Sequence, residues 1–236
     1  MDADYYTYCD ELYAAWHRGE LELSDLPEGL FDLAYAPEPY IRLQEGRRPL
    51  HMLLTNPGAP MAFQHRSEAP SAYSAFAELS RNVYLSDQFA REGGTNARRR
   101  IRKSLDFALF LGFSGLVNVE TIPFHSARLD KRRALKVSQT AQSIQAYQSQ
   151  LQAFLADQPV LIVAACRSDE SIHAGSIARS PWLKFQCDLA SIHPERLVLK
   201  PLTRKGSKVT SALFSSGSKH VVLTMGSNNL PSLDAV

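Results

Sequence analysis

Short apolar runs alternate along the chain with longer segments of helical periodicity. Residues 49–55 (PLHMLLT) and 159–165 (PVLIVAA) are continuous apolar runs, a pattern typical of strands buried on both faces of a sheet. Residues 115–122 (GLVNVETI) form a third run, which ends before a proline. The chain therefore predicts three core strands, and we expect two further short strands at residues 196–199 and 220–224.

The segments between these runs carry apolar side chains every three or four residues, the spacing of one helix face. The most regular of them is the Gln-rich stretch 137–157. Ser168 or Asp169 is placed to cap a shorter helix that extends to Ile177. We also expect helices at 71–89 and 95–113 and a helical cap over residues 1–45.

Strands that alternate with helices predict right-handed β-α-β units. The expected fold class is α/β, a three-layer α/β/α sandwich with a central, mainly parallel sheet. A chain of 236 residues is long enough for one such domain. We expect a single domain over residues 1–236, in which residues 46–236 form the core behind the N-terminal cap.

Composition excludes several classes of protein. No apolar run approaches the roughly 20 residues of a spanning helix, and the acidic, aromatic start of the chain differs from a secretory signal. Three cysteines without C-x-x-C spacing suit neither a disulfide framework nor a zinc site. We therefore expect a cytoplasmic protein with reduced thiols, no membrane partner, no metal and no cofactor.

Basic residues gather in two places although the net charge is only +2. One cluster covers residues 98–103, and the other comprises Arg128 and residues 131–133. Such clusters are commonly solvated helix faces. Their alternative role is contact with the phosphates of a nucleic acid.

Polar residues follow three of the predicted strands. They are Asn56-Pro57-Gly58, the stretch 118–126, and residues 226–229. Ligands of open α/β sheets bind at the carboxyl ends of the strands. We therefore expect these three segments to line one cleft.

Two of these segments and the order of the strands resemble the uracil-DNA glycosylase superfamily. The stretch 55–61 (TNPGAPM) resembles the Asn-Pro-Gly or Asp-Pro turn that the family places after its first core strand, and residues 115–118 (GLVN) resemble the strand with its base-reading asparagine. The family usually has a His-Pro-Ser type motif after its last strand. Residues 224–230 (TMGSNNL) stand there instead, without a histidine.

The resemblance implies a DNA partner, single- or double-stranded, and excision of uracil or a related damaged base. Asn118 would pair with the edge of the flipped base, and Asn56 would orient a water toward the sugar. His125 is the second catalytic candidate. The remaining candidates bind the substrate base (Pro57, Gly58, Phe63, Ser227 and Asn228) or contact DNA (Arg128, Lys131 and Arg132 at phosphates, Leu230 by insertion into the duplex).

Each of these assignments has a purely structural alternative. Asn56 is a common turn residue before Pro-Gly, and backbone groups can satisfy the Asn118 amide. Phe63 can belong to the core, and His125 can brace its loop. The alternative function is that of a catalytically weak or inactive protein that binds a nucleotide or nucleic acid in the same pocket. A hydrolase built on His125 and Ser126 is disfavoured because the chain has no G-x-S-x-G elbow.

Overall fold

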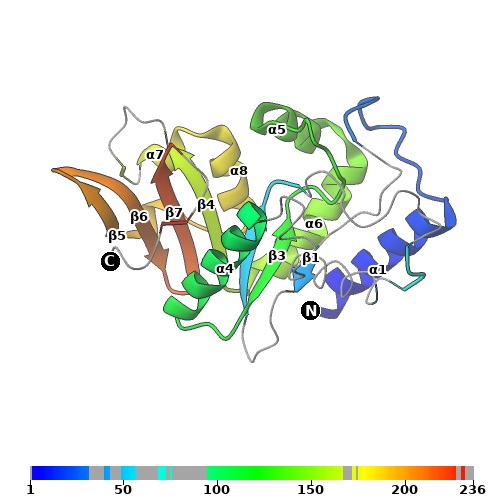
Figure 1. The fold of residues 1–236 in the computed structure, drawn as a ribbon. Helices are drawn as coiled ribbons and strands as arrows, with labels where there is room; N and C mark the ends of the chain where they lie inside the picture. The colour runs from blue at the N-terminus through cyan, green and yellow to red at the C-terminus, as the bar shows by residue number, and fades with distance from the viewer. Residues whose placement is uncertain are drawn as a thin grey trace.

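The computed structural model describes residues 2–31, 40–42, 49–56, 69–72, 75, 95–166, 172–173, 175–226 and 230–231. Its centre is a seven-stranded sheet with the order β1-β3-β2-β4-β7-β6-β5 (Figure 1). The strands are β1 (Tyr40–Arg42), β2 (Leu50–Leu54), β3 (Leu116–Glu120), β4 (Val160–Cys166), β5 (Val198–Lys205), β6 (Lys208–Ser216) and β7 (Lys219–Met225).

The sheet is mixed. Strands β3, β2, β4 and β7 run parallel to one another, whereas β1 pairs antiparallel with β3, and β6 and β5 continue antiparallel from β7. The chain is thus an α/β protein whose four central strands are parallel and whose two edges are antiparallel. Along the parallel part, the strand order reverses between β2 and β4, which makes their carboxyl ends a topological switch point.

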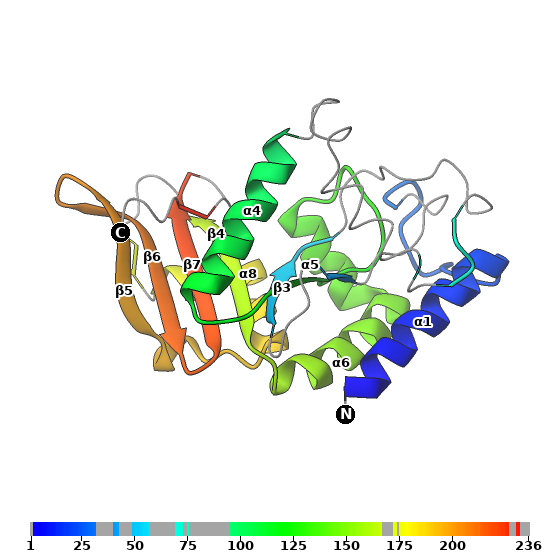
Figure 2. The same cartoon turned by 60° about the horizontal axis from the view of Figure 1, so that its bottom comes forward.

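Helices cover both faces of the sheet (Figures 1 and 2). Helix α4 lies on one face, and α1, α6 and α8 pack on the other. The helices are α1 (Asp2–Arg18), α4 (Thr95–Phe110), α5 (Lys131–Thr140), α6 (Gln142–Ala156), α7 (Gly175–Ala178) and α8 (Pro181–Leu189), with a 3-10 turn η3 at Pro194–Arg196. Within the described parts of the chain, none of these helices is long and apolar enough to cross a bilayer.

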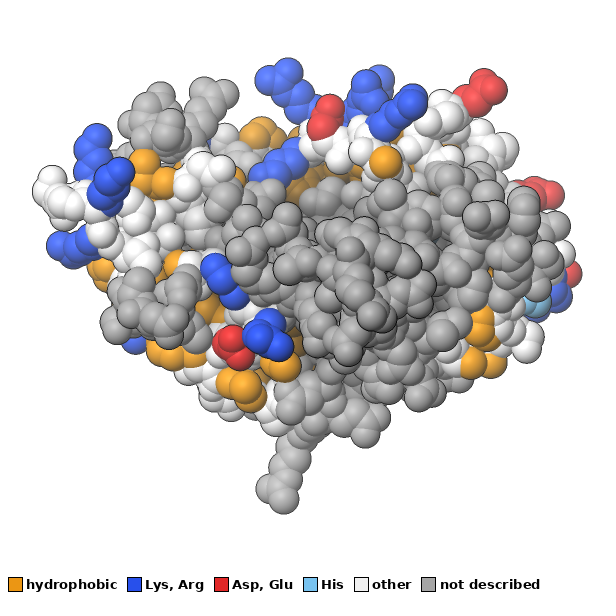
Figure 3. Space-filling model, in the orientation of Figure 1, with side chains coloured by type: hydrophobic (Ala, Val, Ile, Leu, Met, Phe, Trp, Pro, Cys, Tyr) orange, Lys and Arg blue, Asp and Glu red, His pale blue; other side chains and the backbone are white. Residues whose placement is uncertain are grey.

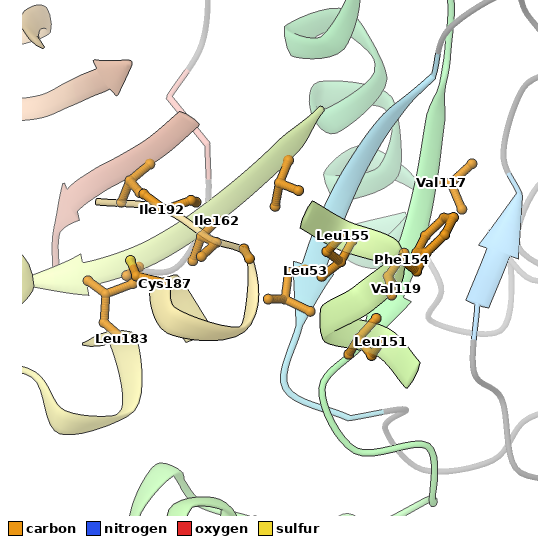
Figure 4. Close-up of a cluster of buried hydrophobic side chains, with 14 of the residues drawn as sticks. Leu53, Val117, Val119, Leu151, Phe154, Leu155, Ile162, Leu183, Cys187 and Ile192 are labelled. Carbon is orange, nitrogen blue, oxygen red and sulfur yellow. The ribbon is translucent and has the colours of Figure 1, made fainter. Parts of the chain in front are cut away.

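Side-chain alternation along β3 decides which residues meet which helices. Val117 and Val119 point toward α6, where they pack with Leu53 of β2 against three side chains of that helix (Figure 4). Those three are Leu151, Phe154 and Leu155, and all six side chains are buried. By the period of two, Leu116, Asn118 and Glu120 face the α4 side. There Leu116 packs with Leu50 of β2 and Phe107 of α4.

Helix α1 belongs to the same core as α6. Tyr5, Tyr13 and Trp16 are buried, and the Tyr5 ring stacks on Phe154 with centroids 4.5 Å apart. The expected N-terminal helix is therefore present at Asp2–Arg18, and its aromatic face covers α6.

The helix predicted at 137–157 is wrong at its N-terminal end, because two helices occupy this region. Helix α5 begins at Lys131, where the Asp130 carboxylate accepts hydrogen bonds from the backbone N–H groups of Arg132 and Arg133, both at 2.9 Å. It ends at Thr140, and the extended backbone of Ala141 (φ −93°, ψ 119°) separates it from α6. One extended residue thus interrupts a periodicity that reads as continuous.

The C-terminal part of the sheet is a meander that the pattern of apolar residues only partly predicts. Strand β6 was missed, and β5 extends well beyond the predicted 196–199. Two-residue turns connect the three strands, with Gly206 and Gly217 at φ 61° and 58°. A Gly-Ser pair between alternating segments is the hairpin signal in both places. The predicted helix at 71–89 lies almost wholly outside the described residues.

His220 supplies a test of this packing. Burial lowers the pKa of His220 to about 4, and its Nδ1 lies 2.9 Å from the Ser215 hydroxyl oxygen. Between pH 6.5 and 4 the unfolded chain binds a proton that the folded chain does not, so stability falls as the pH falls through this window. We expect His220→Asn to remove part of that loss, on the order of 1 to 3 kcal/mol.

Urea unfolding of both proteins at pH 7 and pH 4.5 measures this contribution. The difference between the two proteins isolates His220 from the carboxylates that titrate in the same range. An equal loss of stability in both would show that the imidazole is not kept neutral by the fold.

Candidate functional site

The chain continues alongside β2 after β3 ends. The backbone N–H of Thr121 donates to the Leu54 carbonyl and that of Ile122 to the Thr55 carbonyl, both at 3.0 Å. All residues from 121 to 126 are buried. The predicted polar loop after β3 is therefore an interior segment that prolongs the parallel pair.

Side chains of α6 and α8 satisfy the carbonyls at this point. The Tyr147 hydroxyl donates to the Glu120 carbonyl (2.8 Å), and the Gln148 amide donates to the Thr121 carbonyl (3.1 Å). From α8, Gln186 donates to the Leu54 carbonyl (3.2 Å) and to the Thr121 hydroxyl (3.1 Å). These donors fix the carboxyl ends of β2 and β3 in place, because a buried carbonyl without a partner is costly.

Asn56 holds the rest of the segment. Its Nδ2 donates to the carbonyls of Phe124 (3.4 Å) and Ser126 (3.1 Å), which lie on either side of His125. Both donors of the amide are therefore directed at the backbone, and this fixes the orientation of the side chain. The sequence suggests two alternative roles for Asn56, as a turn residue and as a catalytic residue. In the structure Asn56 is a half-buried side chain at the carboxyl end of β2.

His125 and Ser126 are 6% and 7% exposed. The Ser126 hydroxyl oxygen accepts a hydrogen bond from the Arg128 backbone N–H at 3.2 Å. A loop begins after β3 as predicted, and the apolar neighbours Ile122 and Phe124 keep it in the interior. His125 therefore lies beside Asn56, because Asn56 donates to the carbonyls of the residues that precede and follow His125.

Asn118 lies inside β3 and not at its end. It stands opposite Met52 of β2 and Ile41 of β1, and its side chain is 7% exposed. Its Oδ1 accepts no hydrogen bond from the parts of the chain that the structure describes. Asn56 is four residues beyond Met52, so the two asparagines are separated by about 13 Å along the strands.

Alternation places Glu120 on the same face of β3 as Asn118, one pair closer to the carboxyl end. Glu120 is 4% exposed, whereas Arg128 is exposed at the surface. A carboxylate thus lies buried between the levels of Asn118 and Asn56.

Helix α5 begins with Lys131, whose side-chain cation lies near the end of β4. Partial desolvation lowers the pKa of the Lys131 ammonium although its side chain reaches the surface, and the charge of a Cys166 thiolate at the end of β4 would oppose part of this shift. The two groups are therefore close enough to interact. Arg128 and Arg132 are exposed, as a contact with phosphates would require.

The remaining candidates have two outcomes. Pro57, Gly58, Phe63, Ser227 and Asn228 lie outside the described residues. Leu230 is 5% exposed and packs with Met52 and Leu116 in the core on the α4 side. The expectation that Leu230 inserts into a duplex is therefore at odds with the structure, since an apolar side chain gains more from this burial than from exposure.

The three donors Tyr147, Gln148 and Gln186 were missed in the sequence interpretation. Their one signal is a polar side chain within an otherwise apolar helix face, as in the α8 segment PWLKFQCDL. Nothing in the sequence indicates which carbonyl such a side chain reaches.

Two further observations bear on cofactors. No group of three or more His, Cys, Asp and Glu side chains within the described ranges is arranged to hold a metal ion. Burial raises the pKa of Cys9 and of Cys187 to about 12, so these two thiols stay protonated near neutral pH.

Comparison with known proteins adds no family to this description. No protein-family model, no curated protein and no solved structure matches the chain.

Asn56 can be tested as the support of the 124–126 segment. Asn56→Ala removes both donors from buried carbonyls, and we expect it to lower the free energy of unfolding by about 1 to 3 kcal/mol. Asn56→Asp places a carboxylate against the same two carbonyl oxygens, which favours its protonated form. Its stability should therefore be lower at pH 7 than at pH 4, relative to the native protein at each pH.

Chemical unfolding at the two pH values measures both variants. Native-like stability of Asn56→Asp at pH 7 would mean that the amide donors do not hold this segment.

Proposed function

We propose that this protein reads a flipped nucleobase with Asn118 and hydrolyses the N-glycosidic bond of uracil or a related damaged base in DNA. The observation that carries the proposal is the state of the Asn118 amide. It is 93% buried in the middle of an apolar strand, and no donor from the described residues reaches its Oδ1.

An unsatisfied buried acceptor costs about 1 to 3 kcal/mol. Leucine has the same branched arrangement of four side-chain heavy atoms and would avoid this cost among neighbours such as Met52 and Leu116. An amide at this place is useful when a ligand brings the missing donor. The N3–H of uracil is such a donor, and the amide NH₂ would in turn donate to the uracil O4.

The arrangement of the strands gives a second line of support. Asn118 and Asn56 belong to neighbouring parallel strands next to the switch point, and alternation along β2 and β3 gives Asn118, Met52 and Leu54 the same face. A nucleoside with its base toward Asn118 would extend its sugar toward the carboxyl ends of the strands, where Asn56 stands.

The reaction requires few groups. A water oxygen bonds to the sugar carbon while the carbon–nitrogen bond breaks, and the electron pair leaves with the base. The attacking water loses one proton to solvent, and the anionic base takes up one proton from solvent. Asn56 would orient the water. An amide is not a general base at neutral pH, so we expect slow turnover.

A second candidate function is base binding without catalysis. The observation that favours it is the use of both Asn56 donors in hydrogen bonds to Phe124 and Ser126, which gives Asn56 a structural role. The absence of a histidine in residues 224–230 points the same way. The two functions share the Asn118 contact and differ only in turnover.

The test compares native protein with Asn118→Leu on labelled oligonucleotides that contain one uracil, hypoxanthine or xanthine. Incubation followed by alkali reveals excision, and equilibrium binding of the same oligonucleotides reveals recognition. We expect Asn118→Leu to lose at least tenfold in both, and to unfold at the same or a higher denaturant concentration, because the unsatisfied amide is gone.

Val119→Ala, one residue further on the opposite face of β3, is the matched control. It leaves a cavity against α6 and should lower stability by about 1 to 3 kcal/mol while it preserves recognition. Native recognition by Asn118→Leu would contradict the proposal. Recognition without excision by the native protein would select the binding function.

A further inference from the structure

Strands β5 and β6 extend beyond the rest of the sheet. The last pair between β6 and β7 joins Ser211 to Thr224, whereas β6 continues to Lys208 and pairs there with β5. Residues 204–210 therefore form a two-stranded projecting ribbon with the Gly206-Ser207 turn at its tip. Because β6 is antiparallel to β7, this ribbon projects at the carboxyl edge of the parallel strands, the edge that carries the candidate site.

All charged residues of the projecting ribbon are basic. Arg204, Lys205 and Lys208 are exposed, and none of them forms an ion pair within the part of the chain that the structure describes. From residue 196 to residue 231 the chain has six Lys or Arg residues and no Asp or Glu. A stretch of one charge sign on a projecting hairpin attracts a polyanion.

Helix α5 supplies a second basic group at the same edge. Lys131, Arg132, Arg133 and Lys136 are exposed, and the adjacent Asp130 is engaged in capping the helix. The interaction of Lys131 with Cys166 places the start of α5 near the carboxyl end of β4. Figure 3 shows Lys and Arg side chains over α5 at the top and again over the ribbon at the left.

The separation of the two basic groups sets the size of the ligand. The carboxyl end of β4, where α5 begins, and β6 are two strand spacings apart, about 10 Å. A duplex rises 3.4 Å per base pair, so about three base pairs cover this span. A single nucleotide is too short to contact both groups, whereas a nucleic acid that lies across the edge contacts both.

We propose that the projecting ribbon binds the phosphate backbone of double-stranded DNA that lies across the carboxyl edge, with α5 as the second contact. This rests on the proposed function only for the choice of DNA as the polyanion. A duplex suits the surface better than a single strand does. The described residues of the ribbon include no aromatic side chain on which unpaired bases could stack, and contact through Lys and Arg alone is typical of backbone binding.

The chain offers a matched pair of variants. Arg204→Ser/Lys205→Ser removes one Arg and one Lys from the ribbon, and Arg196→Ser/Lys200→Ser removes the same charges at the opposite end of β5. All four side chains are exposed, so both double variants should fold. Binding is measured by fluorescence anisotropy with a labelled 16-base-pair duplex without uracil, in a series of salt concentrations.

We expect the ribbon variant to bind more weakly at low salt and to lose about 2 from the slope of log affinity against log salt concentration. The variant at the other end should match the native protein. Equal weakening by both variants would show an effect of net charge alone and overturn the proposal, as would native binding by the ribbon variant. A loss confined to a single strand of the same length would overturn the choice of a duplex.

The outcome is independent of catalysis. Excision of uracil from a trinucleotide tests the base site without the ribbon, because so short a substrate cannot reach it. Ribbon-dependent duplex binding without any excision would leave this inference standing and remove the glycosylase activity. Excision of uracil, together with duplex binding that does not depend on the ribbon, would support the glycosylase activity and overturn this inference.

Discussion

The requirement that buried backbone carbonyls find donors determines the architecture at the carboxyl edge of this sheet. Once β2 and β3 end, the chain from 121 to 126 stays in the interior, where its carbonyls are removed from bulk water and need partners. Tyr147, Gln148 and Gln186 supply donors from two helices, and Asn56 supplies two more from β2. The positions of α6 and α8, the path after β3 and the place of His125 all follow from these contacts.

The elements that the sequence predicts well are those that a local pattern determines. Strands β2, β3 and β4 are continuous apolar runs, and their burial on both faces needs no knowledge of their neighbours. Strand β6 was missed because its polar half, near Lys208, projects beyond the sheet and shows little alternation. The carbonyl donors could not be predicted either, since Gln186 and Leu54 are 132 positions apart in sequence.

The candidate site, too, could be predicted only in part from the sequence. Asn56 and Asn118 could be selected from the sequence because an amide beside or within an apolar strand is chemically unusual. Their relation could not, because the register that sets Asn118 opposite Met52 is a property of the paired strands. This register places Asn118 deep in β3 and Asn56 at the edge, so the two asparagines lie at different levels along the strands.

The outer strand of the sheet has a consequence for the behaviour of the protein in concentrated solution. Val198 and Leu199 are 72% and 43% exposed on an edge strand, a combination that invites a second copy to add its own strand. Pro201 lacks the N–H that such pairing needs, and the register shifts between Pro201, Thr203 and Arg204 distort the outer ladder. Like charges on the adjacent ribbon repel an identical edge. The same strand can therefore stay open to solvent without promoting self-association into fibrils.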